Sequence, residues 1–327
     1  MPSFDTVARR VSMRELRLLL AVARCGSILK AAHEIGLTQP AISKSISDLE
    51  ETLGVRLFDR NHRGVEPTPH GRILLRHALA MFAEMRQAVE ELDALSQGTG
   101  GELRIGGTPA MCGGLLPHAV HLMAAQRPGT GYAIVEMETE RLAAEVRAHA
   151  IDIGLGRAPL KHPEDTLGFE ALFDDRLFVV AGAGHRLAGR RAVSPAELAA
   201  QRWLLPPPQT PLRLQLQQSF EALGIDLPAA IVTTMSMLVR YELLATNEFI
   251  TVLHGSLLQF GKLPAHVRIL PVELAGGIPI GLSSVANRTL SPATELFLES
   301  LRASARLMRS ADTKQLQRAL RSRTAQP

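Results

Sequence analysis

Cysteine is scarce in this chain, and its scarcity excludes two classes of protein. Cys25 and Cys112 are the two cysteines among 327 residues, too few for a disulfide framework or a four-cysteine zinc site, and they fit a reducing compartment. Apolar runs such as 18–23 and 177–181 are far too short to cross a bilayer. Residues 1–13 lack the apolar core of a secretory signal. We therefore expect a cytoplasmic protein without membrane contact.

Familiar enzyme motifs are missing as well. The sequence has no G-x-x-x-x-G-K-[ST], no H-E-x-x-H and no G-x-S-x-G. Gly154 and Gly156 are followed by Arg-Ala-Pro, which breaks the dinucleotide-binding pattern. The 11 histidines are dispersed, apart from His62, His70 and His77. We expect no catalytic residue, no metal site and no cofactor.

What the chain does contain is an ordinary globular composition with a basic balance. Hydrophobic residues make up 46% and charged residues 21%, and the length favours two or three domains. The net charge is +4 with an isoelectric point near 9.4. This balance permits a nucleic-acid partner without demonstrating one.

Three short helices are predicted near the N-terminus. Ser12 and Glu15 form a capping box that opens the first helix. Glycine tolerates the left-handed conformation that ends a helix, so Gly26 and Gly36 end the first two. Thr38 is expected to cap the third helix.

The join between the second and third helices is the informative part. Ala32 and Gly36 are four residues apart, Leu37 fills the joint, and this spacing is typical of a helix-turn-helix. Three amphipathic helices of an ordinary bundle are the alternative. The third helix exposes polar and basic side chains, which suit base edges and phosphates. The residues predicted to bind DNA here are Thr38, Gln39, Pro40, Ser43, Lys44 and Ser47.

Residues 57–65 predict a β-wing, in which short strands flank a basic turn closed by Gly64. Arg60 and Arg63 are expected to reach phosphate or a minor groove. A solvated hairpin is the alternative, and the position directly after the third helix favours the wing. Residues 1–67 thus form the predicted DNA-binding domain.

Residues 68–97 predict one long linker helix, opened by Thr68 and Pro69. An apolar stripe of this length does not stay exposed in water, so it either folds back on a domain or pairs with a second copy. Its place between two globular parts favours pairing into a homodimer or homotetramer. The predicted dimerisation residues are Leu74, Leu75, Ala78, Met81, Phe82, Met85 and Val89.

After a glycine-rich linker at 97–101, strands and helices alternate. This rhythm predicts an α/β domain over 98–310, with parallel sheets covered by helices on both faces, followed by a basic, solvated tail at 311–327. The predicted strands are Leu103–Gly106, Ala133–Met137, Ile151–Leu155, Trp203–Leu205, Ile231–Thr234, Phe249–Leu253, Val267–Val272 and Ile278–Val285. The predicted helices are Leu115–Gln126, Arg141–Ala150, Pro211–Leu223, Ser236–Thr246 and one beginning near Ser291.

These residues resemble the LysR-type transcriptional regulators. The similarity is carried by Ser27, Ala31-Ala32, Gly36-Leu37-Thr38-Gln39-Pro40-Ala41-Ile42-Ser43-Lys44, Ile46, Leu49-Glu50, Gly54-Val55, Leu57-Phe58, Arg60, Thr68-Pro69 and Gly71. Within this family, the sequence of residues 206–211 is similar to that of the galactose-binding-protein-regulator branch. The resemblance implies a winged helix-turn-helix, a linker helix and a type 2 periplasmic-binding-protein-like effector domain. It also implies tetramers built from dimers that bind operator dyads on double-stranded DNA.

The same resemblance implies two α/β subdomains joined by two crossing strands. We place the crossings near 172–178 and 269–272. Subdomain I then covers about 101–172 and 272–310, and subdomain II about 173–271.

Three predicted helix starts point into the cleft between these subdomains, where ligands bind in open α/β sheets. Free backbone N–H groups and hydroxyls there suit a small organic anion, and methionines give an adaptable wall. Arg157 either adds a charge or forms a surface ion pair. The predicted effector-binding residues are Thr108, Pro109, Ala110, Met111, Thr210, Met235, Ser236 and Met237.

The function predicted from these features is a DNA-binding transcriptional regulator that senses a small, anionic metabolite. One alternative is an enzyme that uses the two-subdomain scaffold. Another is an architectural DNA-binding protein without a ligand. Cys112 is expected to be a small buried thiol, because redox sensors of the family use a pair of cysteines in this domain.

Overall fold

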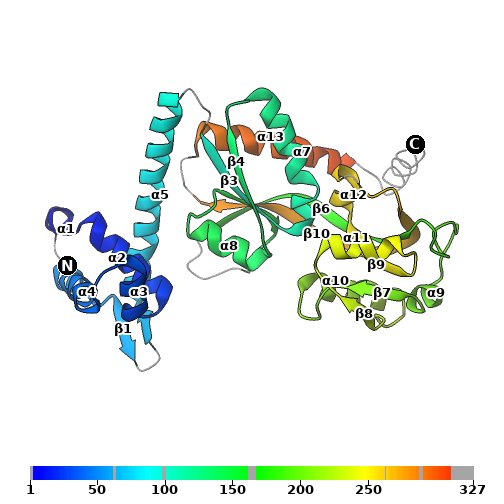
Figure 1. Ribbon diagram of the computed structural model, residues 1–327, viewed down its shortest axis with the longest axis horizontal. Coiled ribbons are helices and arrows are strands. Elements are labelled where there is room, and N and C mark those ends of the chain that lie inside the picture. Colours follow the sequence, from blue (N-terminus) through cyan, green and yellow to red (C-terminus); the bar gives the residue numbers. More distant parts are fainter. Residues whose placement is uncertain are drawn as a thin grey trace. The chain divides into compact units, whose positions relative to one another are not determined.

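The computed structural model describes residues 3–61, 64–97, 101–160, 167–261, 263–286 and 290–310. The chain divides into two compact units, Met1–Asp93 and Ala94–Pro327, drawn from blue to red along the sequence in Figure 1. The division falls inside helix α5 (Pro69–Gln97), so most of the predicted linker helix belongs to the first unit. The predictions for Arg63, His62 and the tail at 311–327 concern residues outside the described ranges.

The first unit is a winged helix-turn-helix, as predicted. Its elements before α5 are α1 (Phe4–Arg10), α2 (Met13–Cys25), α3 (Ile28–Ile35), α4 (Gln39–Leu53), β1 (Phe58–Asn61) and β2 (Gly64–Pro67). Ser12 and Glu15 form the predicted capping box. Gly26 and Gly36 end α2 and α3 with φ angles of 59° and 72°, in the left-handed region that glycine adopts at low cost.

Apolar side chains from α2, α3 and α4 form one core in this unit. Leu19, Val22, Ala31, Ile42 and Ile46 are buried in it. At the turn, the backbone N–H of residue 37 donates to the carbonyl of residue 32 over 3.0 Å. Short α1 packs against α4 and was not predicted as a separate helix.

The wing joins α5 through a tight backbone contact. The hydroxyl of Thr68 donates to the carbonyl of Arg56 over 2.7 Å and accepts from the N–H of Gly71 over 3.0 Å. A Cβ at position 71 would lie 2.0 Å from the carbonyl oxygen of Leu57. Glycine at this position therefore lets the first turn of α5 lie directly against the entry to the wing.

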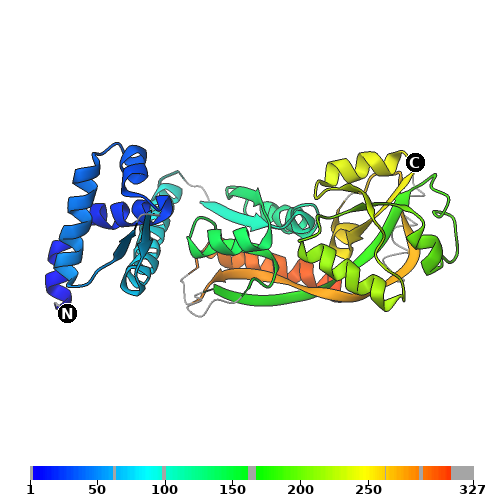
Figure 2. The same cartoon turned by 90° about the horizontal axis from the view of Figure 1, so that it is seen from below.

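The second unit is a mixed α/β structure with one twisted sheet (Figures 1 and 2). Its strands are β3 (Glu102–Gly107), β4 (Gly131–Glu136), β5 (Ile153–Arg157), β6 (Leu167–Gly182), β7 (Arg202–Leu205), β8 (Ala230–Thr233), β9 (Phe249–His254) and β10 (Val267–Val285). Its helices are α6 (Pro109–Cys112), α7 (Leu115–Gln126), α8 (Thr139–Arg147), α9 (Pro195–Ala199), α10 (Pro211–Ala222), α11 (Met237–Ala245), α12 (Gly255–Phe260) and α13 (Pro292–Ser310).

The strand order is β4-β3-β5-β10-β6-β9-β7-β8. The outer strands pair in parallel, as predicted. The two central strands do not, because β10 runs antiparallel to β5 and β6, and β6 runs antiparallel to β9. The prediction of purely parallel sheets was therefore wrong for the middle of the sheet. Central β6 and β10 are the two long crossing strands, visible in Figure 2 as the green and orange ribbons along the unit.

The second crossing lies further along the chain than predicted. The predicted segment 269–272 still belongs to subdomain II, because Ile269 lies opposite Val180 and Leu270 packs in the subdomain II core. In subdomain I, β10 pairs with β5, and this pairing begins at Ile280. The crossing thus falls near 277–279, and the predicted strands 267–272 and 278–285 are one strand with irregular register.

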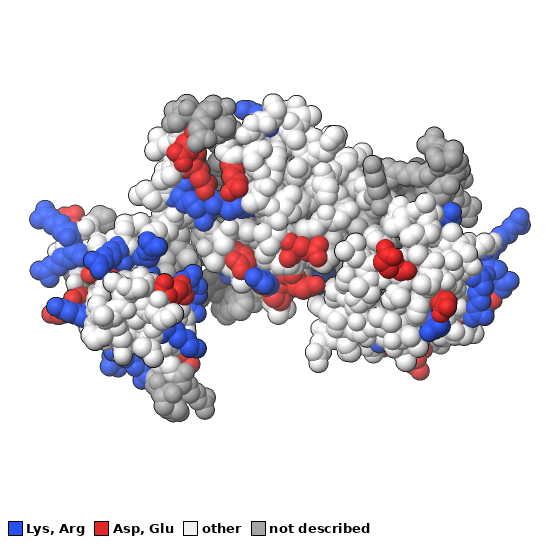
Figure 3. All heavy atoms as spheres, in the orientation of Figure 1, with Lys and Arg blue, Asp and Glu red and all other residues white. Residues whose placement is uncertain are grey.

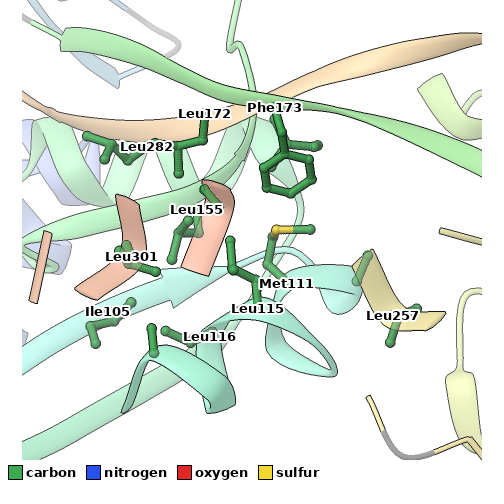
Figure 4. Close-up of a cluster of buried hydrophobic side chains, with 14 of the residues drawn as sticks. Ile105, Met111, Leu115, Leu116, Leu155, Leu172, Phe173, Leu257, Leu282 and Leu301 are labelled. Carbon is green, nitrogen blue, oxygen red and sulfur yellow. The ribbon is translucent and has the colours of Figure 1, made fainter. Parts of the chain in front are cut away.

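Helix α12 departs from the predicted subdomain division. It lies within the range 173–271, yet Leu257 and Leu258 are buried in the same core as Leu115 and Phe297 of subdomain I. Figure 4 shows Leu257 beside the α6–α7 segment that carries Met111 and Leu115. The two subdomains therefore share apolar packing next to the crossing strands.

Candidate DNA interface and effector pocket

Helix α4 buries one face and exposes the predicted DNA-binding face. Gln39, Pro40, Lys44 and Ser47 are exposed, whereas the opposite apolar stripe is buried in the unit core. Lys and Arg side chains gather on the N-terminal unit in the view of Figure 3. Thr38 occupies the N-cap position of α4, as predicted, but its hydroxyl makes no hydrogen bond to the first turn of the helix.

Side-chain contacts hold part of this face in place. Arg60 of the wing donates from Nη1 to Oγ of Ser43 over 3.2 Å, and Ser47 donates to the carbonyl of Ser43 over 3.0 Å. Glu50 accepts from the backbone N–H groups of Leu57 and Phe58 over 2.7 and 3.1 Å. Hydrogen bonds from both ends of the exposed face thus fix α4 to the wing.

The apolar stripe of α5 divides into two parts. Leu74 and Leu75 pack against the core of the first unit, and Ala78 is buried. Further along the helix, large apolar side chains are exposed in the single chain: 50% for Met81, 56% for Met85 and 49% for Val89, with Phe82 half-buried. The part of the predicted dimerisation stripe that is open to a partner therefore begins after Ala78.

The second unit contains a pocket between the two subdomains, which we call the inner pocket. Its volume is about 60 Å³, room for only a few water-sized groups. Subdomain I contributes the start of α6, the start of α8 and the end of β5, and subdomain II contributes the starts of α10 and α11. The start of α12, which packs against the subdomain I core, also lines the pocket. Six of the predicted effector-binding residues line it, namely Thr108, Pro109, Ala110, Thr210, Met235 and Met237.

Two predicted pocket residues lie elsewhere. Met111 is fully buried in the core of subdomain I, and Figure 4 shows it among Leu115 and Phe173. Ser236 is exposed, and its hydroxyl accepts from the N–H of Val239 as the cap of α11. The prediction for Met111 was therefore wrong, because its side chain turns into the core. The capping bond of Ser236 leaves its hydroxyl proton free to donate, so its contact with the effector stays a prediction.

Arg240 is a charged residue of the pocket that the sequence interpretation missed. Its side chain is 3% exposed. It donates from Nη2 to the carbonyl of Thr234 over 3.0 Å and lies 3.9–4.0 Å from the sulfur atoms of Met235 and Met237. Its Nε has no hydrogen-bond partner. Desolvation by burial lowers the pKa of Arg240, and the nearby Glu138 opposes this only in part.

A second guanidinium reaches the inner pocket from the other subdomain. Arg157 ends β5 and is half-buried. Burial lowers its pKa, while Glu138 and Glu140 act in the opposite direction. Two desolvated cations therefore lie near two exposed carboxylates, of which only Glu138 lines the pocket. An anion bound in the pocket would offset the desolvation of both guanidinium groups.

The floor of the inner pocket is tied to the crossing strands by a buried carboxylate. Asp175 of β6 is fully buried and accepts from the N–H of Ser256 over 3.0 Å and from its hydroxyl over 2.5 Å. His254, which lines the pocket, has Nδ1 3.5 Å from Oδ2 of Asp175. Neither Asp175 nor His254 stood out in the sequence, because their proximity depends on the pairing of β6 with β9.

The first unit is a helix-turn-helix unit, and the second has a pocket between its two subdomains. This combination defines a ligand-responsive DNA-binding regulator. Comparison with protein families agrees. The description "Bacterial regulatory helix-turn-helix protein, lysR family" matches residues 13–72, and "LysR substrate binding domain" matches residues 96–306. The chain belongs to the LysR family of transcriptional regulators, and its second unit is the family's small-molecule-binding domain.

Individual relatives agree with this assignment. The HTH-type transcriptional regulator GbpR of Azospirillum brasilense is 30% identical over 296 residues, which cover 90% of this chain and 86% of the relative. The SDS degradation transcriptional activation protein of a Pseudomonas species is 32% identical over 305 residues, covering 86% and 93%. A full-length OxyR variant from Pseudomonas aeruginosa shares the fold, with a TM-score of 0.60, 20% identity and coverage of 91% and 95%.

The described residues offer neither a membrane span nor a metal site. No helix in the described part of the chain is long and apolar enough to span a membrane. Among the same residues, no group of three or more His, Cys, Asp or Glu side chains is arranged to hold a metal ion.

Proposed function

We propose that this regulator senses a small organic anion in the inner pocket and contacts DNA through the exposed face of α4. The observation that carries the first part is Arg240, a buried guanidinium with an unpartnered Nε beside the pocket. A buried cation without a counter-ion is costly. A carboxylate, sulfonate or phosphate group offsets that cost, and Arg157 with the hydroxyl of Thr108 supplies further positive or polar contacts. Thr210 lines the pocket, but its hydroxyl already donates to the carbonyl of Pro207 over 2.8 Å.

The DNA-binding part rests on the exposure and chemistry of α4. In the major groove, Gln39 pairs with adenine, Pro40 contacts a thymine methyl group, and Ser43 and Lys44 contact bases or phosphates. Arg60 reaches the backbone from the wing. Thr38 has an uncommitted hydroxyl at the helix start, which suits a phosphate. A solved structure of CbnR, which shares this fold at 20% identity and a TM-score of 0.57, contains its target DNA.

We further propose that the exposed part of α5, from Met81 to Val89, pairs two chains. An isologous interface there sets the spacing of two recognition helices and fits an operator dyad. The pocket has a sensing role and no catalytic step, in keeping with relatives that are regulators. Binding to genomic DNA places the protein in the cytoplasm.

Quantitative footprinting on the DNA upstream of the chain's own gene tests the DNA-binding assignment. Gln39→Ala and Lys44→Ala are each expected to lose about 1–3 kcal/mol of binding free energy. Only Gln39→Ala should relax the sequence preference at one position. Lys30→Ala on α3, which is also exposed, serves as the matched control. If both α4 variants keep the affinity and preference of the parent, the assignment of this face is wrong.

A further inference from the structure

A second hollow adjoins the inner pocket, and we call it the outer groove. Its volume is about 430 Å³, within the range of sites that bind small molecules. It lies between α10 and the irregular segment of β10, and Gln215, Gln218 and Gly276 line it. Arg157, together with Pro211 and Ile278, lines both hollows, so the two hollows adjoin at these side chains.

The outer groove has an apolar part, formed by Pro211, Leu214, Ala275 and Ile278, and a polar part, formed by Arg157, Gln215, Gln218 and Ser219. Arg157 is its only charged lining residue among those the structure describes. Gln215 and Gln218 each offer two N–H donors and one carbonyl acceptor. The Oε1 atom of Gln215 is buried and has no hydrogen-bond partner. An unpaired buried acceptor is costly, so a ligand that brings a donor to this atom is favoured over an apolar one.

The backbone of β10 adds further polar groups to the groove. The register of β10 against β6 shifts between Glu273 and Gly277, so the regular strand pairing is interrupted there. Ser219 fixes this segment by donating to the carbonyl of Ala275 over 3.0 Å. Gly276 has a φ of 83° and open space at its Cβ position, which leaves the peptide groups accessible and disfavours any side chain.

We propose that the outer groove binds the hydroxylated tail of the same acid whose anionic group lies in the inner pocket. The inner pocket has room for an acid group and little more, whereas the groove offers uncharged donors and acceptors that match hydroxyls. The ligand class is therefore a polyhydroxylated carboxylic acid. This inference rests on the proposed anion-sensing function. It adds to that function a binding site for the part of the ligand beyond its charged end.

Isothermal titration of the full-length protein with four probes tests the proposal. Glycolate carries the acid group alone, gluconate adds the hydroxylated tail, hexanoate has a tail without hydroxyls, and sorbitol has hydroxyls without the acid. Gluconate is expected to bind at least tenfold more tightly than glycolate and hexanoate. Sorbitol is expected to bind more weakly than every acid.

Variants separate the two parts of the site. Gln215→Ala combined with Gln218→Ala should reduce gluconate affinity to that of glycolate and leave glycolate affinity unchanged. Gln217→Ala is the matched control, because Gln217 lies on the same helix and its amide donates to Glu221 over 3.1 Å outside the groove. An unchanged glycolate titration also verifies that the double variant is folded.

Each outcome bears on a different statement. If no acid binds, the proposed anion-sensing function is wrong. If glycolate binds and gluconate gains nothing over it, the groove does not hold a hydroxylated ligand tail, and the inference is wrong while anion sensing stands. Equal affinity for gluconate and hexanoate, or for gluconate and sorbitol, also overturns it. Gluconate affinity unaffected by the double glutamine variant places the tail elsewhere.

Discussion

Replacing Arg240 by methionine is expected to stabilise the unliganded protein and to abolish its affinity for acids. The substitution removes the charge and retains an unbranched apolar side chain. In the native protein Arg240 is 3% exposed. Its guanidinium donates to the carbonyl of Thr234 and to the weakly accepting sulfur atoms of Met235 and Met237, while Nε has no partner. The surrounding methionine sulfur atoms at 3.9–4.0 Å accommodate a thioether without new polar groups.

The magnitude follows from two opposing terms. Burying an ion without a counter-ion costs several kcal/mol. Replacing Arg240 also removes the charged hydrogen bond to the carbonyl of Thr234, and a hydrogen bond of this kind contributes about 1.5–3 kcal/mol. We expect a net gain of about 1 kcal/mol in the free energy of unfolding, and a rise in Tm of roughly 2–4 °C. Acid affinity should fall by about 2–5 kcal/mol, the cost of removing one partner of a buried charge pair.

Thermal unfolding without ligand and titration with glycolate measure the two effects on one sample. Arg213→Met is the control: Arg213 is also desolvated, which lowers its pKa, and its Nη1 lacks a partner. It lines neither hollow, so the control should keep its acid affinity. A less stable Arg240→Met variant that still binds glycolate as the parent does would refute the reasoning and make Arg240 a structural residue.

Two other predictions concern reactivity and assembly. Burial, with a smaller contribution from Glu136, raises the pKa of Cys112 to about 11, so the thiolate fraction at pH 8 is about one in a thousand. In a Cys25→Ser background the rate of alkylation by iodoacetamide should keep rising through pH 10, and a plateau below pH 9 would contradict this pKa. Met85→Glu places a charge on the exposed part of α5 and should lower the mass measured by light scattering, whereas His77→Glu, also exposed, should not. A native mass for Met85→Glu would rule this face out as the interface.

Local features of the fold were predictable from the sequence. The limits of α7 agree with the predicted Leu115–Gln126. The turn at Gly36 follows from a glycine that adopts a φ of 72°. In these segments the signals for beginning and ending an element lie within a few residues of the element itself.

Non-local features were not predictable in this way. β10 was predicted as two strands, 267–272 and 278–285, yet it is one strand whose pairing with β6 continues on both sides of the irregular segment between them. Arg240 looks like an ordinary surface residue in the sequence, and its burial depends on which elements surround α11. Met111 follows a helix start, but α6 has only four residues, and the side chain turns into the core.

The double crossing of β6 and β10 has a consequence for the order in which the protein is made. Subdomain I begins with β3, but its core is completed by Phe297 and Leu301 of α13, and β5 has no neighbour on one side until β10 is synthesised. At translation rates of roughly 5–20 residues per second, the early strands remain without this cover for about 7–25 s. The DNA-binding unit has all its core residues within its own short stretch of chain and folds first. A chain truncated before Phe297 therefore retains a foldable DNA-binding unit attached to an effector unit that lacks part of its first core.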